Sequence, residues 1–229
     1  MATLGAREFR YLRAVGLVTV LCLILFLLRI AITGSYRYWF IPQNLALAWA
    51  SLIFAWLLVA RLKEHRWLSW QNASLSGLWL AFLPNSWYVL TDFVHVRVNG
   101  DISQLYDIVL MTSLVVSGFT LGFTSLYLVH LQLIKRLGSQ ISGVLVSLIL
   151  LLSSFAIYLG RDLRWNSWDV VADPSGLILN VSDRVVDPFG HPRAFNVTVL
   201  FFVLIGTLYL ALWIWARPTL RQAQRPGKT

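Results

Sequence analysis

Residues 83–95, with the sequence LPNSWYVLTDFVH, are the stretch around which we expect the chain to fold. The stretch begins as an apolar membrane-type helix and then becomes polar. At 100° per residue, a face of about 80° carries an amide, a phenol, a carboxylate and an imidazole, from Asn85, Tyr88, Asp92 and His95. Such groups are costly in or near a bilayer unless they face protein, water or a ligand. This face is therefore predicted to form one wall of a polar site at the outer membrane surface.

Pro84 lies near the middle of the apolar run that contains this stretch, residues 74–94. Proline cannot donate a hydrogen bond to the carbonyl of Leu80, and its ring clashes with that carbonyl. The sequence therefore predicts a kink or break at Pro84. A break can line a cavity or be a tolerated kink, and the sequence leaves both interpretations open.

The composition is that of a membrane protein. Of the 229 residues, 58% are hydrophobic, 14% are aromatic and only 13% are charged. A helix needs about 20 mostly apolar residues to cross the hydrocarbon layer. Six runs come close to this length, so we predict an all-α polytopic membrane protein with six transmembrane helices. The runs are residues 12–32, 43–60, 74–94, 105–130, 140–160 and 195–216.

The lysines and arginines lie mostly on one side of the predicted membrane. Twelve fall before or at the start of the first run, in the second and fourth connections and after the last run, whereas seven fall on the opposite side. By the positive-inside rule both termini are cytoplasmic, and we predict a multi-pass protein of the plasma membrane. Because this distribution accounts for the net charge of +9, the expected partner is the lipid bilayer and no nucleic acid is expected.

The first run is interpreted as a retained anchor, because it is too long for a signal peptide and lacks a clear small-residue cleavage site. Arg13 and Arg29 lie at its ends, where we expect both side chains to extend to the lipid headgroups. Cys22 is the only cysteine of the chain, which excludes an intrachain disulfide and a cysteine-rich zinc site.

Two further patterns concern helix packing and the outer surface. In the fourth run, Gly118 and Gly122 form a GxxxG spacing that predicts close packing against another helix. After the fifth run, apolar residues at helical spacing predict an amphipathic helix on the outer face, between the fifth and sixth runs. These residues are Leu177, Ile178, Val181 and Val185. We divide the chain into one transmembrane domain, residues 1–216, and a basic cytoplasmic tail, residues 217–229, that we expect to be disordered.

Polar blocks at residues 85–95, 106–107 and 161–169 all emerge on the outer side under this topology, and we predict that they form one site. Asp92 and His95 are the candidate catalytic residues, because an aspartate one turn away can orient an imidazole for acid/base work. Arg161 and Arg164 would hold an anionic group, such as the phosphate of a lipid-linked substrate. The predicted substrate-binding residues are Asn85, Tyr88, Asp107, Arg161, Arg164, Asn166 and Asp169.

Three other interpretations stay open. A metal ion could be held by Asp92 and His95 with Asp107 or Asp169, although the sequence contains no metal-site motif. A transporter of a small solute or ion would use Asp92 and Asp107 to attract a cation or proton. A structural or accessory membrane subunit without catalysis would use the same charges only to join helix ends. The sequence identifies no cofactor, no particular small or lipid-linked polar substrate and no protein partner.

The chain resembles an uncharacterised family of bacterial integral membrane proteins, domain of unknown function 1361. The resemblance covers about residues 40–215 and implies a six-helix bacterial membrane protein without a known activity. It rests on several motifs taken together, which are Leu83-Pro84-Asn85, Tyr88, Thr91-Asp92, His95, Tyr106-Asp107, Arg161, Leu163-Arg164 and Asn166-Ser167-Trp168-Asp169.

Overall fold

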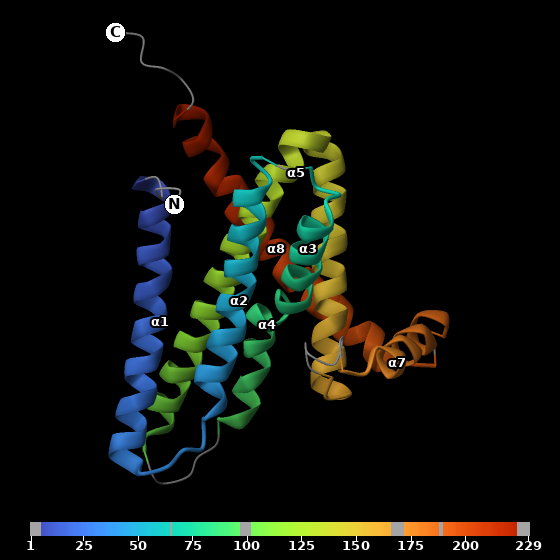
Figure 1. Ribbon diagram of the computed structural model, residues 1–229. Coiled ribbons are helices and arrows are strands. Elements are labelled where there is room, and N and C mark those ends of the chain that lie inside the picture. The colour runs from blue at the N-terminus through green and yellow to red at the C-terminus, as the bar shows by residue number, and fades with distance from the viewer. Residues whose placement is uncertain (1–5, 65, 97–101, 166–171, 188–189, 224–229) are drawn as a thin grey trace.

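The computed structural model shows a bundle of α-helices (Figure 1). It describes residues 6–64, 66–96, 102–165, 172–187 and 190–223. Within these described residues, four helices are long and apolar enough to cross a membrane, over Leu12–Thr33, Phe40–Arg61, Gln104–Asp162 and Pro192–Ala216. Large apolar side chains on them, such as Leu17 and Leu200, are exposed on the outside of the bundle, as lipid-facing residues are. The chain is therefore a multi-pass helical membrane protein.

The first two helices form an antiparallel pair. Helix α1 spans Ala6–Thr33 and helix α2 spans Phe40–Arg61, and a short turn joins them at the lower end in Figure 1. Both lie against α5, whose residues from 104 onward ascend beside them. The turn contains Tyr38, whose side chain is fully buried under the end of the bundle. This turn therefore contributes to the core.

The segment around Pro84 is broken, as the sequence predicts, into three pieces. Helix α3 spans Trp70–Phe82, the four-residue helix α4 spans Asn85–Tyr88, and the 3₁₀ helix η1 spans Val89–His95. The amides of Ser86 and Trp87 bond to the carbonyls of Leu83 and Pro84, three residues back, so the chain tightens directly after the proline. The prediction of one apolar helix over residues 74–94 is corrected to this series of shorter helices.

Helix α5, Gln104–Asp162, contains 59 residues and reverses direction within its length (Figure 1). The reversal is at Gly138, whose φ of 80° and ψ of 171° lie outside the helical region. A residue with a Cβ atom adopts such a positive φ only with strain, which explains glycine at this position. The two arms of α5 contain the predicted fourth and fifth runs.

The predicted amphipathic helix is present as α7, Pro174–Val186, which projects from the side of the bundle (Figure 1). The side chain of Asp173 caps it by accepting a hydrogen bond of 3.0 Å from the amide of Gly176. Helix α8 spans Pro192–Ala223. It continues beyond residue 216, so residues 217–223 are helical where the sequence predicted a disordered tail.

Two glycines let the broken segment pack against α5, which confirms the packing interpretation of the GxxxG spacing. A Cβ atom on Gly118 would overlap the carbonyl oxygen of Ser86 and lie 2.7 Å from Cγ2 of Val89. A Cβ atom on Gly122 would lie 2.9 Å from Nε1 of Trp87. On the opposite side, Ser86 Oγ is 3.0 Å from Ser51 Oγ of α2. Helix α4 is therefore held between α5 and α2.

Candidate functional site

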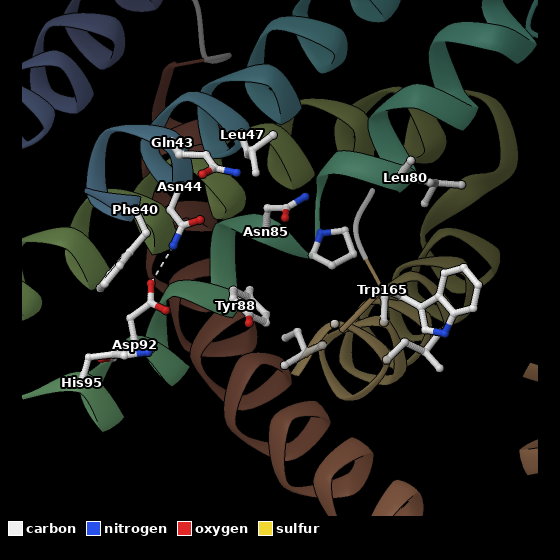
Figure 2. Close-up of a pocket in the computed structure, with 16 residues that line it drawn as sticks. Phe40, Gln43, Asn44, Leu47, Leu80, Asn85, Tyr88, Asp92, His95 and Trp165 are labelled. Carbon is white, nitrogen blue, oxygen red and sulfur yellow. Dashed lines mark hydrogen bonds between the residues drawn. The ribbon is translucent and has the colours of Figure 1, made fainter. Parts of the chain in front are cut away.

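A pocket of about 380 Å³ lies between α2, the broken segment and the second arm of α5 (Figure 2). Polar side chains gather at one end of the pocket, and Leu80 and Trp165 lie at the other (Figure 2). The lining residues are Phe40, Gln43, Asn44, Leu47, Leu80, Ala81, Pro84, Asn85, Tyr88, Asp92, His95, Ala156, Ile157, Leu159, Gly160 and Trp165. Pro84 and several residues after it therefore line a cavity, as one of the two interpretations of the break predicts.

The structure brings together the four residues that the sequence placed on one helical face. Asn85, Tyr88, Asp92 and His95 all line this pocket, although the backbone that carries them changes from α-helical to 3₁₀. In a 3₁₀ helix residues three apart lie directly above one another, which keeps Asp92 and His95 on the same side. The four side chains therefore stay on one face where the backbone changes to a 3₁₀ helix, because they are spaced three and four residues apart.

Asp92 is bound by a residue of α2. Asn44 Nδ2 donates a hydrogen bond of 2.7 Å to Asp92 Oδ2, and Asp92 is only 4% exposed. A buried carboxylate oxygen needs such a donor, because leaving it unpaired would cost about 1–3 kcal/mol or more. Asn44 therefore fixes the carboxylate in place at the polar end of the pocket.

His95 is oriented differently from the sequence-based prediction. Its Nδ1 lies 3.2 Å from the backbone carbonyl oxygen of Asp92, and its ring packs on Phe40 with ring centres 5.0 Å apart. A carbonyl oxygen can only accept, so Nδ1 donates in this contact and, in the neutral ring, Nε2 is left as the acceptor. The backbone carbonyl of Asp92 therefore orients the imidazole of His95. The sequence had predicted that the Asp92 carboxylate would orient it.

Tyr88 and Asn85 come from the short helix α4. A Cβ atom on Gly160 would lie 3.3 Å from Cε2 of Tyr88, so the second arm of α5 approaches the phenol ring closely because it has a glycine there. Asn85 Nδ2 donates to the carbonyl of Phe82 at 3.2 Å, across the break at Pro84. Both side chains are partly buried at the pocket wall.

Asp107 does not line the pocket. Its Oδ1 lies 2.8 Å from Nε of Arg29, and its Oδ2 accepts a hydrogen bond of 2.8 Å from the hydroxyl of Tyr38. Burial raises the pKa of Tyr38 to about 12, so the phenol keeps its proton and donates at neutral pH. Because Arg29 is fully buried in this ion pair, the prediction that it extends to the headgroups is wrong.

The remaining predicted residues lie at or beyond the end of α5. Arg161 and Arg164 are exposed and are not among the lining residues of the pocket. Asn166 and Asp169 lie outside the described residues. The neighbouring Asp162 forms an ion pair of 2.6 Å with Arg193 of α8, which ties α8 to the end of α5. Within the described residues, no group of three His, Cys, Asp or Glu side chains could hold a metal ion.

Sequence analysis missed several residues of the site. Phe40, Gln43 and Asn44 come from the first five residues of α2, and Trp165 follows the end of α5. Two adjacent carboxamides, Gln43 and Asn44, at the start of an apolar run were the available signal for the α2 side. Periodicity within one segment does not show which other segment faces it, so the sequence alone does not place these carboxamides in the site.

Comparison with known proteins places the chain in a family. A family model described as "Protein of unknown function (DUF1361)" matches residues 43–208, which is more than half of the chain and contains most of the pocket lining. No curated protein matches the chain. No solved structure matches it either.

Proposed function

This chain belongs to the DUF1361 family of proteins of unknown function, and we propose that its pocket binds a small or lipid-linked polar substrate at the outer face of the plasma membrane. One observation carries the proposal. Three elements, α2, α4 and η1, bring five polar side chains to one cavity of about 380 Å³, and these are Asn44, Asn85, Tyr88, Asp92 and His95. Ligand pockets of about 300–1,000 Å³ commonly combine apolar walls with a few convergent polar groups, as this pocket does.

The proposed topology has six crossings with both ends of the chain in the cytoplasm. The broken segment of α3, α4 and η1 supplies one crossing, and the two arms of α5 supply two. The beginning of α1, the connection after α2, the turn at Gly138 and the end of α8 lie at the same end of the molecule (Figure 1). The connection and the turn carry basic residues that include Arg61, Lys63, Lys135 and Arg136, which supports a cytoplasmic location for this end.

Reporter fusions test this topology. A fusion after Arg66 is expected to be active only with a reporter that works in the cytoplasm, because Arg66 belongs to the basic connection after α2. Fusions after Gly100 and Asp187 are expected to be active only with a reporter that works outside the membrane. A cytoplasmic reporter active after Gly100 would place the pocket at the inner face and defeat the proposed location.

Binding is the part of the proposal that the geometry supports most directly. The amides and the phenol can orient a ligand without any chemical step. Asp92 and His95 are the lining groups that can exchange a proton with a substrate, so processing of the substrate would use them. Because the Asp92 carboxylate is bonded to Asn44, the imidazole would act without it as a direct partner.

A blocked pocket is expected to lose its ligand. Ala156 lines the pocket from α5, so Ala156→Trp places a large ring in the cavity. We expect native mass spectrometry of the purified full chain to detect a co-purified lipid or small molecule on the wild type and about tenfold less on Ala156→Trp. Tyr88→Phe removes a hydroxyl at the polar end and is expected to reduce occupancy about two- to tenfold, as for one lost hydrogen bond.

Two matched variants control this experiment. Ala211→Trp and Tyr36→Phe make the same changes at exposed positions and are expected to leave occupancy unchanged. An unoccupied wild type, or equal occupancy in Ala156→Trp and Ala211→Trp, would count against a binding pocket. It would favour the alternative of an accessory membrane subunit.

A further inference from the structure

We infer that the polar end of the pocket receives an uncharged, hydroxyl-rich headgroup, such as the sugar of a glycolipid, while the apolar end receives the beginning of its lipid chain. The inference rests on the proposed function, because it names the substrate class of the same pocket. It follows from three features of the lining: the kind of polar groups, their charge and the separation of polar and apolar ends.

The polar groups match hydroxyls. The lining contains three carboxamides, Gln43, Asn44 and Asn85, together with the phenol of Tyr88. Each carboxamide offers both donors and an acceptor, and each hydroxyl of a sugar also donates and accepts. A phosphate offers chiefly acceptors, so it would leave the amide oxygens facing it unpaired. The mixture of groups therefore favours a ligand that carries several hydroxyls.

The charges of the lining disfavour an anion. None of the described lining residues is a lysine or an arginine, the side chains that pair with phosphates in proteins. Arg161 and Arg164, which the sequence assigned to an anionic group, are exposed beyond the lining. Burying an anion without a cation beside it is costly. The described lining is therefore better suited to an uncharged headgroup than to a phosphate.

The single carboxylate does not require a cationic ligand. Asp92 Oδ2 already accepts a hydrogen bond from Asn44, and Asp92 is 96% buried. A hydroxyl can donate to the remaining lone pairs of the carboxylate without bringing a second charge out of water. An amine would have to lose its hydration on entering the pocket, and the three carboxamides would add little to its binding.

The shape of the lining suits an amphipathic molecule. Phe40 lies at the polar end against His95, where its ring can pack on the C–H face of a sugar. Leu80 and Trp165 lie at the opposite end, away from Asp92 (Figure 2). Leu47, Ala156 and Ile157 add further apolar wall. A glycolipid would place its sugar at the polar end of the pocket and the beginning of its lipid chain at the apolar end.

Three lipids with identical acyl chains test the headgroup. Full-length protein is placed in phosphatidylcholine nanodiscs that contain equal amounts of glucosyldiacylglycerol, phosphatidic acid or phosphatidylethanolamine, and bound lipid is counted by native mass spectrometry. We expect the glucosyl lipid to be retained at least about tenfold over either other lipid. Asn85→Leu is expected to reduce its retention about tenfold, whereas the exposed control Asn196→Leu changes it less than twofold.

The Arg161→Gln/Arg164→Gln double variant distinguishes binding of a sugar headgroup from binding of a phosphate headgroup. Both arginines are exposed, so the change does not alter the core. We expect it to keep glucosyl-lipid retention within twofold of wild type. Preferred binding of phosphatidic acid that this variant abolishes would overturn the sugar assignment and leave the binding function intact. Preferred binding of phosphatidylethanolamine that Asp92→Asn abolishes would also overturn the sugar assignment and leave the binding function intact. Retention of no lipid, with no difference between wild type and Ala156→Trp, would overturn the binding function itself.

Discussion

Replacing Asp107 by alanine is expected to lower the free energy of unfolding by about 3–5 kcal/mol, because the change leaves the guanidinium of Arg29 buried without its counter-charge. Arg29 is fully buried and Asp107 is 1% exposed. The lost contacts are the 2.8 Å ion pair and the hydrogen bond from Tyr38. Denaturant unfolding of the purified protein in detergent measures the effect.

The paired variant Arg29→Met/Asp107→Leu provides the decisive control. It removes both charges together and fills the site with apolar side chains, so stability is expected to return close to wild type. Asp183→Ala removes an exposed carboxylate and is expected to cost less than about 1 kcal/mol. Equal losses for Asp107→Ala and Asp183→Ala would show that the Arg29 pair does not hold α1 to α5.

Replacing Gly118 by alanine is expected to destabilise the protein by about 1–3 kcal/mol, the usual cost of overpacking. The new methyl group would overlap the carbonyl oxygen of Ser86, which is backbone and cannot rotate away. Relief of the overlap requires α4 to move off α5, and α4 carries Asn85 and Tyr88. The same variant is therefore expected to lose pocket occupancy about tenfold, as measured by native mass spectrometry.

Gly77→Ala and Gly206→Ala are the matched controls for this prediction. Both glycines lie inside helices, and a Cβ atom at either would meet nothing within 4 Å. Alanine favours the helix over glycine by about 0.5–1 kcal/mol, so these variants are expected to be neutral or slightly stabilising. An equal loss of stability in all three variants would show that Gly118 has no specific role in the packing of α4 against α5.

Together these variants separate two roles that the sequence assigned to one site. Asp107 and Asp92 were both predicted to serve a shared pocket. In the structure Asp107 is committed to Arg29 and Tyr38, whereas Asp92 faces the cavity with one oxygen held by Asn44. Loss of stability is therefore the expected phenotype at Asp107, and loss of ligand is the expected phenotype at the cavity-facing residues.

Much of the candidate site was predictable because it lies on one short segment. The spacing of Asn85, Tyr88, Asp92 and His95 put them on one face, and these four residues do line one pocket. The break at Pro84 was predictable from the chemistry of proline. The partners of that face were not predictable, because Gln43 and Asn44 belong to another helix. Trp165 follows the end of α5 and lies 77 residues after Tyr88 along the chain.

The sequence by itself determined the class of this protein, its long apolar helices, the position of the break and the polar face after it. These properties depend on composition and on spacings of a few residues, which act within one element. Only the tertiary structure decided that Asn44 binds Asp92 across 48 residues and that Arg29 binds Asp107 across 78 residues. The physical reason is that a buried charge takes its partner from whichever helix packs beside it, and that neighbour is set by the packing of the whole bundle.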